Sequence, residues 1–487
     1  MIHCSTVEAR VNMVSQMMTE PTHGLVSELS RTHHVSRQTL YRWAHIGRDA
    51  LEAAFGKMSQ PQKPSQSISS LVLTLLLETH ASYRGIQSML KDVHGIQISL
   101  GTIASLVKEA GQRAQRWMSQ QRADMPRALA LDEQYSSQRG KAYLNVIDVH
   151  SGHVWASIPP VKVDGESWIL LWWQLQEQGI HASCTVSDGG MAIHEALKQV
   201  QSLPSHQRDV WHILHLAAQV QGRLEHCVKK AEDRLTIIQR QAQRVADGKK
   251  VIGRRPSADV DGHVRYIAQV RSIAEGVSYL SQELKRLLEI VVLSANAHMG
   301  ILTSQDRMAE IETIVCLLEE LAVQAPEKMQ THLRLLTRHL SLALPSLLLF
   351  ARSLDERQHQ ACEQLGPHAI SLLAWAWQRR KILGPSTQEL LQSIEPAWRA
   401  VAEPLFHAWE TAVRASSAVE NWHSIVRPHL AVHRTLSAGM LALLAVWHNH
   451  RIAPRGLHEG LSPLQRTDAS IPAMNWLTVL GYPAQVA

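Results

Sequence analysis

The pattern of apolar and polar positions predicts a helical N-terminal region. In residues 22–51, Leu25 and Leu29 fall on one face of a helix, and Ser36 is well suited to cap the helix that follows. A tight turn with the apolar Val35 beside it joins the two segments. Two short helices joined in this way predict a helix-turn-helix module.

The same pattern recurs after a linker at 58–67 that is rich in Pro, Gln and Ser. Ser82 is placed to cap one helix and Ser99 the next, while Gly95 is placed to end the first of them. Apolar periodicity predicts helices over 67–80, 82–95 and 98–117. These residues therefore predict a second helix-turn-helix in tandem with the first.

The hydrophobic pattern changes at residue 128. Short apolar runs predict strands at 128–134, 141–150, 153–160, 182–188 and 208–212, and longer periodic runs predict helices at 166–179 and 191–200. The order β-β-β-α-β-α-β indicates a mixed α/β layout. Residues 213–409 are almost purely helical in pattern, and 410–487 predict one or two helices and a polar tail.

Composition and charge narrow the classes of function. The 487 residues are 45% hydrophobic, which excludes a disordered protein, and they carry a net charge of +6. Residues 1–131 hold 14 Lys and Arg against 9 Asp and Glu, which favours a negatively charged partner for this part. Five scattered cysteines are typical of a reduced intracellular protein. No apolar run reaches the about 20 residues that span a bilayer, so we expect a cytoplasmic protein.

Polar residues at the start of the predicted recognition helices are candidates for DNA contact. Their types suit phosphates and base edges in a major groove, although a plain helical hairpin with a solvated face would show the same pattern. The candidates in the first module are Ser36, Arg37, Gln38, Thr39, Tyr41 and Arg42, and those in the second are Ser99 and Thr102. A basic loop at 247–256 adds Lys249, Lys250, Arg254 and Arg255, which are either phosphate contacts or a solvated turn.

Three acids are candidates for a metal site. Asp132 ends one predicted strand and Asp188 ends another, and strand ends are where open α/β sheets place their sites. Asp188 alone could be a helix cap. Crowded carboxylates repel one another unless a cation lies between them, and oxygen-only clusters suit Mg²⁺ or Mn²⁺. The candidate third acid is Glu420, which lies on a predicted amphipathic helix with Arg427 on the same face. Taken alone, Glu420 would indicate only a surface salt bridge.

In order and context these motifs resemble the DDE transposases of bacterial insertion sequences. The matching elements are the tandem helix-turn-helix modules, "LALDEQY" at Asp132, "TVSDGG" at Asp188, "RDVWH" and, after a long helical stretch, "SSAVENWHSIVRPHL". The first two acids are 56 residues apart and the last two are 232 apart. The long second interval is similar to that of transposases with an all-helical insertion inside a ribonuclease H-like core.

The resemblance implies a multidomain, α-rich fold. It implies helix-turn-helix domains at 1–60 and 61–127, the second with a linker helix. It also implies a ribonuclease H-like α/β core with a mixed sheet, formed by 128–212 and 410–487 around an all-α insertion at 213–409.

The resemblance also implies roles for individual residues. Asp132, Asp188 and Glu420 would hold two Mg²⁺ or Mn²⁺ ions that activate a water or a 3′-hydroxyl and stabilise the leaving oxygen. His212 would orient the scissile phosphate or a metal-bound carboxylate, with Asp209 as its partner, or the two would form a buried structural pair. Further expectations are a stacking role or a core position for Trp211 and Trp422, support from Arg427, and a place for Glu133 on the opposite face of the sheet.

Two functions of different classes follow from these patterns. The favoured one is an enzyme that binds the terminal inverted repeats of its element and cuts and joins double-stranded DNA, including target DNA, as a homodimer or larger assembly close to the bacterial nucleoid. The alternative is a catalytically inactive, transposase-derived DNA-binding regulator that uses only residues 1–131. Retention of all three acids in motif context favours the enzyme.

Overall fold

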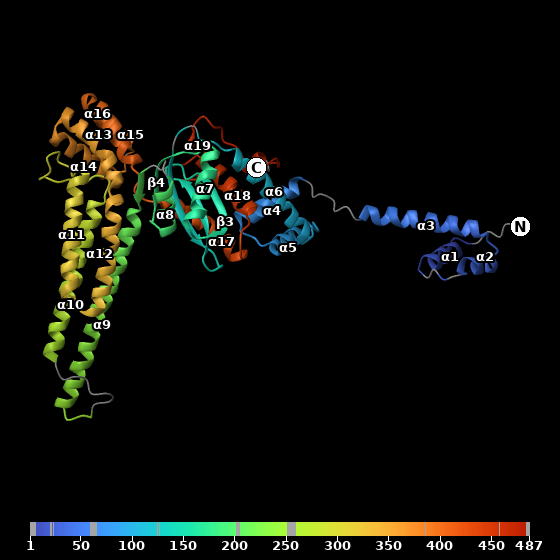
Figure 1. Cartoon of the computed structure of the whole chain (residues 1–487), viewed down its shortest axis with the longest axis horizontal. Helices are drawn as coiled ribbons and strands as arrows, with labels where there is room; N and C mark the ends of the chain where they lie inside the picture. Colours follow the sequence, from blue (N-terminus) through green and yellow to red (C-terminus); the bar gives the residue numbers. More distant parts are fainter. Residues whose placement is uncertain are drawn as a thin grey trace.

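A computed structural model describes residues 6–19, 22, 24–58, 66–123, 125, 127–200, 205–250, 260–384, 386–456 and 458–483. Within these residues the fold is α-rich, with one mixed sheet of five strands (Figure 1). This confirms the α-rich character and the mixed sheet that the sequence predicts.

Three helices form the first N-terminal unit, α1 (Val7–Thr19), α2 (Leu25–Thr32) and α3 (Arg37–Met58). Leu29, Val35 and Leu40 of the predicted helix-turn-helix pack with Met13 into a small core of their own. Ser36 Oγ accepts a hydrogen bond from the Thr39 N–H at 3.1 Å, so it caps α3 as predicted. Helix α1 was not predicted; Met13 is its one buried residue within the described chain.

The second module comprises α4 (Gln66–Glu78), α5 (Tyr83–His94) and α6 (Leu100–Gln120). The predicted caps at Ser82 and Ser99 are confirmed, and Gly95 ends α5 in a left-handed conformation. The buried residues of these helices belong to one hydrophobic core with the sheet and with α17 (Ser417–Val432) and α18 (Ala438–His450). The second module therefore does not have a core separate from the α/β domain.

The sheet has the strand order β3-β2-β1-β4-β5. Its strands are β1 (Arg127–Tyr135), β2 (Lys141–Asp148), β3 (Val154–Lys162), β4 (Ala182–Ser187) and β5 (Ser205–Arg208). Strand β1 is antiparallel to β2 and parallel to β4, and β4 is parallel to β5. The predicted strand at 208–212 is wrong, because β5 ends at Arg208 and a helix begins at Val210.

Side chains on β1 alternate between two cores, one on each face of the sheet. Ala130 packs with α17 and α18, whereas Leu129 and Leu131 pack with α7 (Gly165–Glu177) and α8 (Met191–Gln199). The alternation follows from the two-residue period of a strand. It means that consecutive residues at the end of β1 face different layers of helices.

The chain leaves the sheet after β5 and returns to it at α17. Eight helices lie between them in the described residues: α9 (Val210–Ala246), α10 (Val260–Leu287), α11 (Ser304–Gln324), α12 (Glu327–Leu347), α13 (Leu349–Leu365), α14 (Pro367–Leu383), α15 (Thr387–Ser393) and α16 (Pro396–Thr411). The longest of them extend away from the sheet as a bundle (Figure 1). The predicted helical character of 213–409 is confirmed for its described residues.

Two short helices, α19 (Pro463–Thr467) and α20 (Trp476–Val479), follow α18. Within the described part of the chain no single helix is both long and apolar enough to cross a membrane. One pair bent by 41°, α12 with α13, would qualify together by length and composition.

Candidate active site

Asp132 and Glu133 lie within β1, which continues to Tyr135 instead of ending at Asp132 as predicted, and they face opposite sides of the sheet. Asp132 Oδ1 accepts a hydrogen bond from the Glu133 N–H at 2.7 Å, and its side chain is only 14% exposed. Glu133 Oε1 instead accepts the indole N–H of Trp168, on α7, at 2.9 Å. The prediction that Glu133 points to the other face is confirmed. Asp132 is the acid directed toward α17.

Asp188 directly follows β4, the parallel neighbour of β1. Its Oδ1 accepts a hydrogen bond from the Gly190 N–H at 2.8 Å, and Gly190 rather than Asp188 is the N-cap of α8. Gly189 has a φ of +74°, and a Cβ on it would come within 1.1 Å of the Arg208 guanidinium. Glycine at 189 is thus required for the turn that follows Asp188. The helix-cap alternative for Asp188 is wrong.

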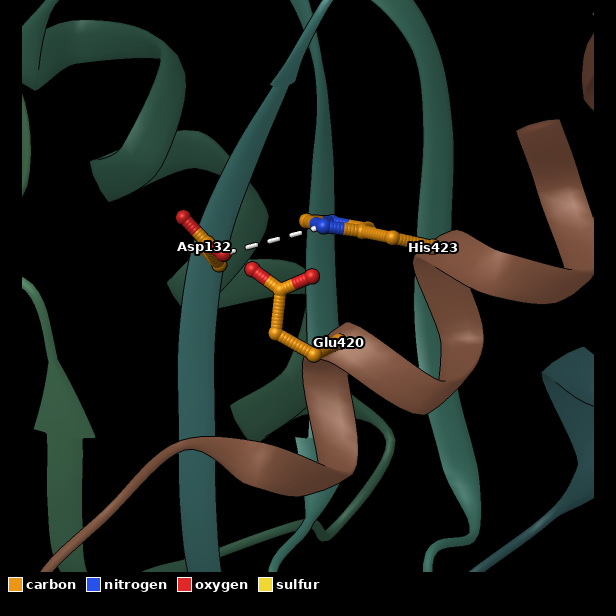
Figure 2. Close-up of side chains that lie close together, drawn as sticks. All are labelled: Asp132, Glu420 and His423. Atoms are coloured by element: carbon orange, nitrogen blue, oxygen red, sulfur yellow. Dashed lines mark ion pairs between the residues drawn. The ribbon is translucent and has the colours of Figure 1, made fainter. Parts of the chain in front are cut away.

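Helix α17 brings Glu420 and His423 to Asp132. Figure 2 shows these side chains converging from α17 and β1, and one ligand atom from each lies within 4.8 Å of the others. Glu420 lies in the first turn of the helix and pairs with Arg427, 3.2 Å away. The structure therefore places the predicted third acid beside the first, across an interval of 288 residues.

Asp188 and His212 are both near enough to Asp132 to change its pKa. Burial, the nearby Asp188 carboxylate and, to a smaller extent, Glu420 raise the pKa of Asp132 to about 7, against lowering effects of the Glu133 N–H and His212. Burial also raises the pKa of Glu133. Negative charge on Asp132 is therefore costly, mainly because the carboxylate is buried and next because Asp188 is near.

Asn145 on β2 orients His423 through a buried hydrogen-bond network. Asn145 lies opposite Asp132 in the strand register, and its Oδ1 accepts from Trp422 Nε1 at 3.0 Å and from Ser157 Oγ at 2.7 Å. Because an indole N–H can only donate, this bond fixes the amide, and Asn145 Nδ2 must donate to His423 Nε2 at 3.2 Å. A neutral imidazole that accepts at Nε2 carries its proton on Nδ1.

The His423 Nδ1–H consequently faces Asp132 Oδ2, 3.8 Å away. Burial lowers the pKa of His423 to about 4, which agrees with a neutral ring. Although a nitrogen of His423 lies within reach of the two carboxylates, its proton disfavours metal ligation. His423 is therefore placed to orient Asp132, while the carboxylate oxygens are left for a cation.

Asp209 connects the start of α9 to the start of α17. Its Oδ1 caps α9 by accepting from the Trp211 N–H at 2.7 Å. Its Oδ2 accepts from the Ser416 N–H at 2.9 Å and from the Ser416 hydroxyl. Although burial opposes ionisation, the contacts with His212 and Ser416 hold the pKa of Asp209 below its usual range. Because Ser416 lies four residues before Glu420, Asp209 sets the position of that acid.

His212 lies between Asp209 and the acid cluster. Its Nδ1 is 3.3 Å from Asp209 Oδ2, an ion-pair distance, although the ring nitrogen makes no well-aligned hydrogen bond within the described residues. Contact with Asp209, together with the more distant charges of Asp188 and Asp132, raises the pKa of His212. Asp209 is thus a buried structural acid beside His212, and the role of His212 toward a phosphate or a metal-bound carboxylate stays a prediction.

The two tryptophans next to these residues differ in their surroundings. Trp422 is fully buried and belongs to the core, and its indole N–H is used by Asn145. Trp211 is 50% exposed and stacks on His215, with ring centroids 4.7 Å apart. The core alternative is therefore wrong for Trp211 and correct for Trp422.

The candidate DNA-contacting residues lie outside the acid cluster. Ser36, Arg37, Gln38, Tyr41 and Arg42 are exposed along the first turns of α3, and Thr39 is half-buried. At the start of α6, Ser99 is exposed and Thr102 half-buried, and Ser99 Oγ accepts from the Thr102 N–H at 3.0 Å. Lys249 and Lys250 follow the far end of α9, where Lys249 pairs with Asp247. Arg254 and Arg255 lie outside the described residues.

The residues present fit a divalent cation. Carboxylate oxygens of Asp132 and Glu420 come together within 4.8 Å, and Asp188 acts on Asp132 electrostatically. The hard oxygen donors suit Mg²⁺ or Mn²⁺ better than softer metals.

Sequence reasoning missed His423 and Asn145. His423 carried a usable signal, because residues three apart on a helix share a face and Glu420 was already a candidate. Asn145 carried none, since its partners lie 12, 277 and 278 residues away in the chain.

Comparisons with known proteins do not assign the chain to a family. No protein-family model matches it, and no curated protein matches it either. The case for a function therefore rests on the residues and geometry of the site.

Proposed function

We propose that the protein is a DDE transposase that binds terminal inverted repeats and catalyses metal-dependent cleavage and transfer of DNA strands. The observation that carries the proposal is the meeting of Asp132 on β1 with Glu420 on α17, beside the parallel strand β4 that Asp188 follows. The Asp188 carboxylate is near enough to raise the pKa of Asp132. A buried acid whose pKa is raised partly by other acids from distant parts of the chain is expected where a site is built for cations.

The sheet supports a ribonuclease H-like core. Its chain order, three strands before α7, β4 before α8 and then β5, agrees with the layout expected from the sequence except at the boundaries of β5. Asp132, on β1, and Asp188, directly after β4, lie toward the carboxyl ends of these two neighbouring parallel strands. Open α/β sheets carry their ligands at that end. The interruption between β5 and α17 by helices agrees with an all-α insertion.

Asp132, Asp188 and Glu420 would hold the divalent ions, two per site. When bound, these ions would supply activation of the attacking oxygen and stabilisation of the leaving oxygen. Asp132 is oriented by the N–H of Glu133 and by His423, and Glu420 is positioned through Asp209 and Ser416. These contacts hold the carboxylates in place before DNA arrives, so less reorganisation is needed during the reaction.

Two further residues are suited to act on the DNA itself. Contact with Asp209 raises the pKa of His212 and so favours its protonated form, the form that would attract a scissile phosphate. Trp211 is half-exposed beside it and could stack on an unpaired base, an interaction worth about 1–3 kcal/mol. Sequence-specific binding would come from the exposed first turns of α3 and α6.

The experiment that tests the proposal compares cleavage with binding in the full chain. Asp132→Ala, Asp188→Ala and Glu420→Ala should each abolish Mg²⁺- or Mn²⁺-dependent cleavage of repeat DNA but leave binding nearly intact. The acids lie apart from the predicted DNA-reading helices, which is the physical reason for the separation. Glu410→Ala is the control, because Glu410 pairs with Arg380 in the helical region.

If all four variants cut as well as the parent, the metal-site interpretation fails and the regulator alternative takes its place. Because two ends of an element must be cut together, we also expect the cutting complex to hold at least two copies of the chain. Mass measurement of the DNA-bound complex checks this, and a strictly monomeric complex on paired ends would contradict it.

A further inference from the structure

A groove between α9 and α12 collects positive charge away from the acid cluster. It encloses about 810 Å³ and is lined by the basic side chains Arg223, His226, Lys230, Lys328 and His332. The polar and small residues that complete the lining within the described chain include no acid. A groove of this charge suits a polyanion.

The cations of this groove are not neutralised by neighbouring acids. Among the described residues, no carboxylate lies within ion-pair distance of Arg223, Lys230 or Lys328, and the Arg223 guanidinium instead lies 3.4 Å from the His332 ring. Glu232, the acid of α9 that lies two residues beyond Lys230, pairs with Arg271 of α10 at 2.5 Å. Solvated helical faces usually interleave charges of both signs, whereas the charged residues of this lining are all basic.

The groove continues the face of α9 that carries His212. Gln219, Arg223, His226 and Lys230 follow His212 at intervals of seven, four, three and four residues, which keeps all five on one side of a helix with 3.6 residues per turn. The buried residues of α9, such as Val220 and Leu224, lie on a different side. A ligand that extends from His212 along this face of α9 would pass over the groove.

From these observations we propose that the groove binds the phosphate backbone of the DNA duplex on one side of the scissile bond. The proposal rests on the proposed function for the location of that bond. At 1.5 Å per residue, the groove extends from about 10 to about 27 Å beyond His212 along the axis of α9. Duplex DNA rises 3.4 Å per base pair, so the binding positions fall about 3 to 8 base pairs from the cut.

The test measures binding of the full chain to repeat duplexes whose flank beyond the cut is lengthened from 2 to 15 base pairs, with chelator present so that no cleavage occurs. For the parent protein, affinity should rise as the flank grows from about 3 to 8 base pairs and then level off. Arg223→Glu/Lys230→Glu/Lys328→Glu should remove this dependence. In a plot of log affinity against log salt concentration, measured with the long flank, the slope for this variant should be smaller in magnitude by about 3. Each phosphate that is no longer neutralised reduces the slope by about 0.9.

The matched control reverses three exposed cations of the same bundle that do not line the groove, Lys229→Glu/Lys285→Glu/Arg338→Glu. It should behave as the parent does. The proposal is overturned if the parent shows no dependence on flank length, if the control loses it as fully as the groove variant, or if the groove variant keeps it. Flank-dependent binding by a protein that cuts none of the substrates with Mg²⁺ or Mn²⁺ would leave the groove in place and reject the transposase proposal.

Discussion

Replacing Asp132 by Asn should stabilise the metal-free protein at neutral pH, although it removes a candidate catalytic group. Burial first, and then Asp188, raise the pKa of this carboxyl from 3.8 to about 7. A shift of about three pKa units corresponds to about 4 kcal/mol of unfavourable free energy when the group is forced to ionise. Asn keeps the shape of the side chain and still accepts the bond from the Glu133 N–H.

The effect should depend on pH in a defined direction. Below about pH 3.8 the carboxyl is protonated in both the folded and the unfolded chain, so Asp132 imposes no penalty. As the pH rises, the unfolded chain releases the proton first, and the contribution of Asp132 to stability is lost progressively until the pH passes about 7. The gain from Asp132→Asn should therefore be small near pH 4 and reach up to about 4 kcal/mol above pH 7.

Urea denaturation followed by tryptophan fluorescence measures this difference in the free energy of unfolding. Trp168 and Trp172 report on it because they lie in the core between the sheet and helices α7 and α8. Asp92→Asn, at an exposed position of α5, is the control and should show no such pH dependence. Mg²⁺ should stabilise the parent more than the variant, because the cation offsets repulsion that the variant lacks. An equal gain at pH 4 and pH 7.5, or a loss at pH 7.5, would refute the reasoning.

Three further predictions concern positioning and recognition. Asp209→Ala should lower the free energy of unfolding by about 3–5 kcal/mol, because it leaves buried N–H groups unsatisfied, and should slow cleavage; unchanged urea unfolding would contradict this. Asn145→Leu should destabilise the protein by about 1–3 kcal/mol per orphaned partner and lower the cleavage rate more than DNA affinity, as measured by single-turnover kinetics. Replacing Arg37, Gln38 and Arg42 together by Ala should weaken repeat binding in a mobility-shift assay without changing thermal stability, since all three are exposed; retained affinity would show that α3 does not read the repeat.

Local chemistry made much of the chain predictable from sequence alone. Ser36, Ser82 and Ser99 each cap the helix that follows, because a short hydroxyl side chain satisfies an N–H only a few residues away. Four strands and the helices between them follow from apolar periodicity, which needs no distant partner. The acids Asp132 and Asp188 could be singled out because each follows a recognisable buried run.

The boundary of β5 was predicted wrongly although the signal for it, a capping residue, is local. Strand propensity favoured the apolar residues Val210 and Trp211, but Asp209 accepts the Trp211 N–H and begins a helix there instead. A capping bond of this kind competes directly with a ladder hydrogen bond for the same donor.

Only the tertiary structure decided how the site is assembled. Glu420 meets Asp132 because the chain returns from the helical region at a point held by Asp209 and Ser416, a contact between residues 207 positions apart. The protonated nitrogen of His423 follows from Asn145, which depends in turn on a strand register. Such pairings depend on which elements pack together, and no local pattern encodes that. The raised pKa of Asp132 has the same origin, because burial and neighbouring charge exist only once the sheet and α17 have come together.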